Sequence, residues 1–177
     1  MRLDPKLRYL TEIAARKHRR TISSFIEWAV EASLRDVRLY QGTGYQGDED
    51  ITVEDESKDL WDIDESERFA RLAIKYPELL THQEQEIWKL LSDSGLMSPA
   101  RSRNHNGTVF WSWGILEDTV FPKLRRYWSE LLDAYSEGAE SSRKWVDKIE
   151  SEIASGKIYS ADQTKGTSND DDLDLPF

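Results

Sequence analysis

Residues 2–34 read RLDPKLRYLTEIAARKHRRTISSFIEWAVEASL, and this stretch decides the fold that we expect at the start of the chain. Apolar residues recur there at three- and four-residue spacing in two runs, which predicts two amphipathic helices. Asp4 and Pro5 are typical of the first turn of the first helix, and Thr21 is a good N-cap for the second. A basic turn separates the two runs, which consist of Leu7, Leu10, Ile13 and Ala14, then Ile22, Phe25, Ile26, Ala29, Val30, Leu34 and Val37.

Two helices of this size bury too little apolar surface to be stable alone. Their apolar residues therefore need a partner, and the nearest one is a second copy of the same chain. We accordingly expect a homodimer.

The same residues, in this order, resemble the ribbon-helix-helix DNA-binding family of the Arc and Met repressor type. The resemblance covers residues 1–38 and includes Arg2-Leu3-Asp4-Pro5 and the pattern Thr21-x-Ser23-x-x-Ile26-x-x-Ala29. It implies an intertwined dimer in which one strand from each chain forms an antiparallel ribbon in the DNA major groove. Leu3 would then point into the dimer core, while Arg2 would read base edges. The strand of that family usually begins several residues earlier, so this ribbon offers one reading residue per chain.

The resemblance also implies a phosphate clamp at the start of the second helix, where free backbone N–H groups and the helix dipole favour an anion. Basic residues of the preceding turn would add contacts to the DNA backbone. The residues expected to bind DNA are Arg2, Lys17, Arg19, Arg20, Thr21, Ser23 and Ser24.

Charge is distributed unevenly over the 177 residues, whose formal net charge is −10. Residues 1–40 hold nine Lys and Arg against five Asp and Glu, whereas residues 41–70 hold two against eleven. A basic head on an acidic body suits a local DNA-binding module better than non-specific coating of nucleic acid.

The chain has no cysteine, which excludes a disulfide framework and a cysteine-based zinc site or nucleophile. No apolar run approaches the ~20 residues of a membrane span, so we expect a cytoplasmic protein with no membrane partner.

We expect a mainly α protein in four parts. Residues 1–39 form the ribbon-helix-helix module, and residues 40–60 form an acidic, glycine-containing linker. Residues 61–156 form a helical, Trp-rich domain with a β-hairpin near 101–113. Residues 157–177 form a flexible, disordered tail with an acidic tip.

The hairpin is predicted by Asn106-Gly107, a strong turn signal, and by the alternation of Val109, Trp111 and Trp113 with Phe110 and Ser112. The favoured interpretation is a surface hairpin that packs its tryptophans onto the helices. The other is a winged helix, in which the first arm makes a second nucleic-acid surface from Arg101, Arg103 and His105.

The last eight residues read DDDLDLPF and resemble the C-terminal peptide of bacterial single-stranded-DNA-binding proteins, with an inserted Leu173-Asp174. The resemblance implies docking on replication, recombination and repair proteins. An aromatic tip can enter an apolar pocket while the aspartates steer it to a basic rim. The alternative is a solubilising tail. The docking residues would be Asp170, Asp171, Asp172, Asp174, Leu175, Pro176 and Phe177.

Catalysis is not expected, because the three histidines have no metal-ligand spacing and no phosphate loop, nucleophile elbow or dinucleotide fingerprint occurs. No cofactor or metal is predicted. The leading hypothesis is a homodimeric, sequence-specific DNA-binding protein that regulates transcription or maintains a plasmid or phage. The alternatives are an interaction protein that docks through its tip on replication and repair enzymes, and an antitoxin.

Overall fold

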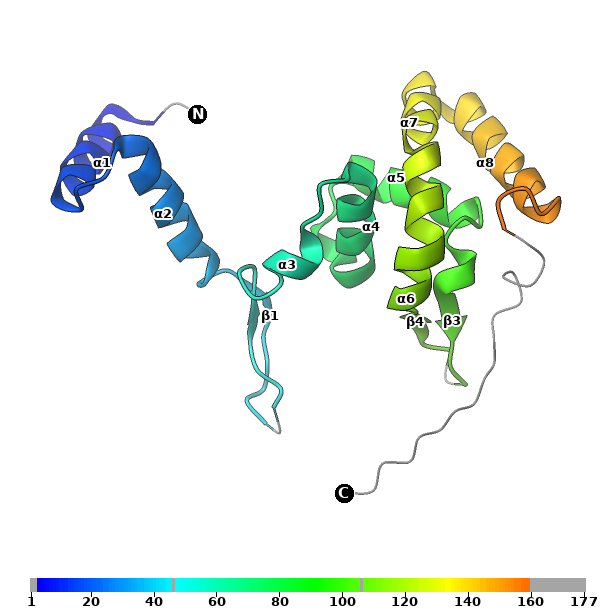
Figure 1. Ribbon diagram of the computed structural model, residues 1–177, viewed down its shortest axis with the longest axis horizontal. Coiled ribbons are helices and arrows are strands. Elements are labelled where there is room, and N and C mark those ends of the chain that lie inside the picture. The colour runs from blue at the N-terminus through cyan, green and yellow to red at the C-terminus, as the bar shows by residue number, and fades with distance from the viewer. Residues whose placement is uncertain (1–2, 46, 106, 160–177) are drawn as a thin grey trace. The chain divides into compact units, whose positions relative to one another are not determined.

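The computed structural model describes residues 3–45, 47–105 and 107–159, and the chain divides into two compact units (Figure 1). Unit 1 is Met1–Trp61 and unit 2 is Asp62–Phe177. The described part is mainly helical, as the sequence predicts, with two small antiparallel hairpins. None of its helices is long and apolar enough to cross a membrane.

Unit 1 begins with the two predicted helices, α1 (Pro5–Lys17) and α2 (Ile22–Leu34). Both predicted N-caps are confirmed: the Asp4 carboxylate accepts a hydrogen bond from the Lys6 N–H at 2.9 Å, and the Thr21 hydroxyl accepts one from the Ser24 N–H at 3.2 Å. The sequence predicted that the second helix would continue to Val37, but α2 ends at Leu34. Val37 instead accepts a backbone hydrogen bond from Val53, which draws it toward a hairpin.

That hairpin corrects the prediction of a linker at residues 40–60. Strand β1 (Arg38–Tyr40) pairs antiparallel with β2 (Ile51–Thr52), and a short helix α3 (Ser57–Leu60) follows. The acidic side chains close the turns instead of repelling one another. Asp48 accepts hydrogen bonds from the Thr43 N–H and hydroxyl at 2.9 and 2.7 Å, which hold the pKa of that carboxyl below its usual value. Asp50 accepts one from the Gly42 N–H at 2.9 Å.

Gly42→Ala is expected to open the loop between β1 and β2. A Cβ at this position would overlap the backbone of Asp48 and Glu49, and backbone cannot move aside as a side chain can. We expect the Thr43 and Gly44 amides to exchange with deuterium about tenfold faster, measured by NMR. Gly114→Ala is the control, because a Cβ there meets nothing within 4 Å. Unchanged exchange in the Gly42 variant would contradict the loop geometry.

Unit 2 is built on four longer helices, α4 (Glu65–Lys75), α5 (His82–Asp93), α7 (Phe121–Glu137) and α8 (Ala139–Ala154). Thr81 and Glu84 form a capping box at the start of α5, in which they exchange both hydrogen bonds. In Figure 1 α8 lies along α7, and contacts of α7 with α4 and α5 complete the bundle. The core contains fully buried side chains from all parts of the unit, among them Leu91, Leu96, Leu116, Phe121, Leu124, Leu131 and Ile149.

Short elements connect α5 to α7: the 3₁₀ turn η2 (Ser98–Ala100), strands β3 (Arg101–Arg103) and β4 (Val109–Trp111), helix α6 (Trp113–Ile115) and the π-helical turn η3 (Leu116–Val120). A 3₁₀ turn, η1 (Pro77–Leu79), lies between α4 and α5. The predicted hairpin near 101–113 is confirmed, with Arg101 opposite Trp111 and Arg103 opposite Val109. Trp111 and Trp113 both pack against the core, in agreement with the favoured interpretation of the hairpin.

The core of unit 2 extends past residue 156, where the sequence predicted the helical domain to end. Ile158 and Tyr159 are buried in the core of unit 2, and the Tyr159 hydroxyl donates a hydrogen bond to the Leu96 carbonyl at 2.8 Å. Gly156, at a φ of 72°, turns the chain back after α8 so that these residues can enter the core. Residues 160–177, which include the acidic tip, lie outside the described part of the chain.

Candidate nucleic-acid interface

The basic turn of unit 1 is the segment 18–21 between α1 and α2, and hydrogen bonds to the end of α1 hold its backbone in place. The Arg19 N–H donates to the Arg16 carbonyl at 3.0 Å, and the Arg20 N–H donates to the Ala15 carbonyl at 2.9 Å. Arg19 adopts a left-handed conformation, with a φ of 55°. This conformation costs a non-glycine residue roughly 1–2 kcal/mol, and such strain is often kept at functional positions.

An aromatic cluster packs the turn against α2. The rings of His18, Phe25 and Trp28 lie 5.1–5.7 Å apart between centroids, and the Arg20 guanidinium lies 5.5 Å over the Trp28 ring. The sequence analysis placed Phe25 in the apolar run of the second helix. It did not predict that His18 and Trp28 would pack with it. The available signal was the i, i+3 spacing of Phe25 and Trp28 directly after a basic turn. The cluster fixes Arg20 beside α2, while Lys17 and Arg19 extend into solvent.

The N-terminus of α2 offers two backbone donors. Within the described residues, the N–H groups of Ile22 and Ser23 donate no hydrogen bond, whereas that of Ser24 is taken by Thr21. No acidic residue occupies the first turn. A helix of this length with free N–H groups favours an anion at this end.

The structure therefore brings six of the seven predicted DNA-binding residues to one end of unit 1. The seventh, Arg2, lies outside the described residues, and its neighbour Leu3 is in no strand. The predicted ribbon requires two chains, so a single chain does not test it.

Beside this basic end, unit 1 exposes an unusual amount of apolar side chain. α2 has no buried residue, although most of its residues are apolar or small. Monomeric proteins rarely leave large contiguous apolar surfaces in water. We call the exposed aliphatic side chains of α1 and α2 the exposed apolar set of unit 1: Leu7 (52% exposed), Leu10 (50%), Ile13 (46%), Ile22 (39%) and Val30 (51%).

The second predicted nucleic-acid surface lies in unit 2, on the hairpin of β3 and β4. Arg101, Arg103 and His105 are all exposed there. Helix α5, which precedes the hairpin, carries half-buried Glu84 and exposed Glu86, and carboxylates would repel DNA phosphates. A winged helix with α5 in the major groove is therefore disfavoured, and the hairpin itself is the remaining candidate.

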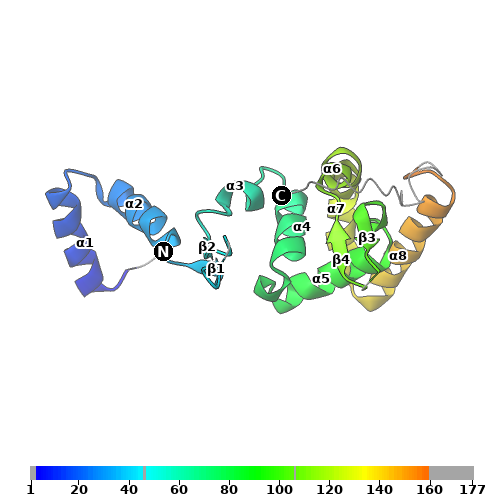
Figure 2. The ribbon, with the colours of Figure 1, turned by 90° about the horizontal axis from the view of Figure 1, so that it is seen from below.

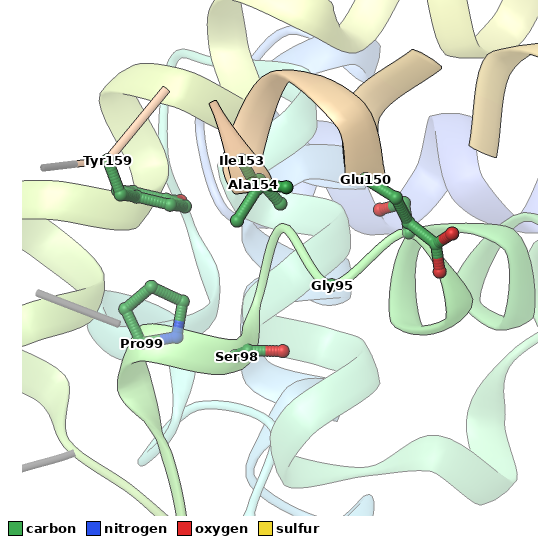
Figure 3. A pocket seen from close by; sticks show the side chains of 8 residues that line it. Gly95, Ser98, Pro99, Glu150, Ile153, Ala154 and Tyr159 are labelled. Carbon is green, nitrogen blue, oxygen red and sulfur yellow. The ribbon is translucent and has the colours of Figure 1, made fainter. Parts of the chain in front are cut away.

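Unit 2 also contains a cavity and several paired carboxylates. A cavity of about 250 Å³ lies between residues 94–99 and the end of α8, with Ile153, Ala154, Pro99 and Tyr159 around it (Figure 3). Glu150 is the one ionisable side chain at its edge apart from Tyr159. Two carboxylates elsewhere in unit 2 have structural partners: buried Glu67 pairs with Arg125, and Glu86 accepts a hydrogen bond from the Tyr135 hydroxyl at 2.6 Å. No group of three metal-binding side chains occurs within the described residues.

Comparison of the whole chain with protein-family models, with curated proteins and with solved structures gives no match.

Proposed function

We propose that this protein is a homodimeric DNA-binding protein, with unit 1 as a ribbon-helix-helix type module. The observation that carries the proposal is the exposed apolar set of unit 1 beside a basic helix end. An apolar set of this size on two 13-residue helices has little to pack against within unit 1. A second copy supplies a matching surface, because a twofold interface joins the same residues from both chains.

DNA is the proposed ligand because the end of the helical pair combines positive charge with free backbone donors. Lys17, Arg19 and Arg20 provide positive charge, and the first turn of α2 provides free N–H donors. Dimerisation would present two such ends, which suits two half-sites on a duplex. The proposed role is regulation of transcription or of a plasmid or phage locus.

Lys17→Ala/Arg19→Ala is expected to weaken duplex binding by the full-length protein. Each lost phosphate contact lowers the slope of log K against log salt by about 0.9, so the double variant should lower it by about two per chain. The measurement is fluorescence polarisation on a duplex selected from a random pool, over a series of salt concentrations.

The matched control is Arg143→Ala/Lys144→Ala, which removes the same charge from the exposed surface of α8. The control should bind as tightly as the unaltered protein. Equal loss in both variants, or failure of the random pool to yield any bound duplex, would overturn the proposal.

A further inference from the structure

A stretch of unit 2 has no carboxylate in a chain that is otherwise strongly acidic. Residues 94–116 contain two arginines and one histidine but no Asp or Glu, whereas the whole chain contains 34 Asp and Glu in 177 residues. The β3–β4 hairpin lies at the centre of this stretch. Figure 2 views unit 2 from the side on which the hairpin lies. Charge complementarity there favours a polyanion over any cationic or neutral partner.

Hydrogen bonds and aromatic packing hold the backbone of the hairpin that carries these basic side chains. The Asn104 N–H donates to the Thr108 carbonyl at 3.0 Å, and the Asn104 side chain accepts from the Thr108 N–H at 2.9 Å. Trp111 anchors the hairpin to α5, with its ring centroid 6.1 Å from that of Trp88. A partner therefore meets a surface that is already ordered, which lowers the entropy lost on binding.

One arginine is held in place while a second is presented beside it. The Arg101 guanidinium lies 5.8 Å over the Trp111 ring, which restricts its motion and leaves its N–H groups exposed for an acceptor. Arg103 is two residues further along β3 and is also exposed. The two side chains lie on the same strand face, so they can contact successive phosphates of one strand.

An aromatic ring occupies the opposite face of the same hairpin. Phe110 is 51% exposed, although its neighbours Val109 and Trp111 are half-buried. Across the hairpin Phe110 pairs with Ser102, which lies between the two arginines in sequence. An unpaired strand that crosses the hairpin edge at β3 can therefore place phosphates on the arginines of one face and a base on the ring of the other. Cationic side chains combined with exposed aromatic rings are how proteins bind unpaired strands.

We propose that the β3–β4 hairpin binds single-stranded nucleic acid, with Arg101 and Arg103 on phosphates and Phe110 stacked on a base. The single strand is favoured over a duplex because paired bases are stacked on each other and leave no face for Phe110. This site is separate from the helical pair of unit 1 and does not depend on the function proposed for it.

The test uses the full-length protein and a labelled 20-nucleotide oligo-dT. Phe110→Ala should weaken binding by about 5- to 150-fold, the range for loss of one base stack, and Phe110→Trp should retain binding. Arg101→Ala/Arg103→Ala should lower the salt slope by about 1.4, or 0.7 for each phosphate of a single strand. Because Phe110 is outside the core, Phe110→Ala should leave the melting temperature unchanged.

Two controls separate this site from unit 1 and from bulk charge. Lys17→Ala/Arg19→Ala and Arg143→Ala/Lys144→Ala should both keep the affinity for oligo-dT. If an unlabelled duplex competes as well as an unlabelled single strand, or if Phe110→Ala binds normally, the proposal is wrong. Absence of oligo-dT binding by the unaltered protein at low salt would also overturn it, whatever the result for duplex binding.

Discussion

Val30→Asp is expected to convert the dimer into a monomer and to abolish duplex binding. Val30 is 51% exposed in the single chain, so an aspartate there costs an isolated unit 1 little. In the proposed dimer the same position would be buried, and an unpaired polar or charged group costs about 3 kcal/mol or more. A twofold interface contains the position twice, so the dissociation constant of the dimer should rise at least about 10⁴-fold. Sedimentation equilibrium measures this directly.

Leu79→Asp is the matched control for this experiment. Leu79 is 49% exposed, nearly the same as Val30, but it lies in unit 2. The control should remain dimeric and should bind duplex normally. A monomeric unaltered protein would contradict the dimer, and would indicate that another surface of the chain covers the apolar set.

Tyr159→Ala is expected to lower the free energy of unfolding of unit 2 by about 3–5 kcal/mol, the usual range for removing a buried aromatic ring. Tyr159 is only 1% exposed, and burial raises the pKa of its hydroxyl. For a domain of this size the melting temperature should fall by roughly 15–30 °C. Calorimetry or thermal melting followed by tryptophan fluorescence provides the measurement.

Further variants separate the ring of Tyr159 from its hydroxyl. Tyr159→Phe keeps the ring but leaves the Leu96 carbonyl without its donor, so a loss of about 1–2 kcal/mol is expected. Tyr45→Ala removes the same atoms from a side chain that is 71% exposed and should change stability by less than about 0.5 kcal/mol. A chain that stops at residue 156 should be as unstable as Tyr159→Ala. If it melts like the full chain, residues 157–159 do not belong to unit 2.

Local signals in the sequence were sufficient to predict the two helices of unit 1 and their caps. Asp4 and Thr21 each cap a helix as expected. The Asn106-Gly107 turn likewise predicted the hairpin of β3 and β4. These features depend on residues within one or two turns of each other, so their energetics are contained in a short stretch of sequence.

The acidic loop at residues 41–50 shows why composition was misleading there. A run of carboxylates predicts an extended chain if each charge is surrounded by water. Asp48 and Asp50 instead accept hydrogen bonds from Thr43 and Gly42, which lie five and eight residues earlier. These hydrogen bonds form only after the chain has folded back on itself. Amino-acid composition alone does not show where the chain folds back.

By itself the sequence determined the helical pair of unit 1, its caps, its basic end and the spacing of its apolar residues. The tertiary structure decided that His18, Phe25, Trp28 and Arg20 form one cluster, and that Phe110 stays exposed while Trp111 is anchored. It also decided that Tyr159 completes the core of unit 2, through a hydrogen bond to a residue 63 positions away. The physical reason is that burial depends on contacts between distant segments, whereas helix periodicity and capping depend on near neighbours.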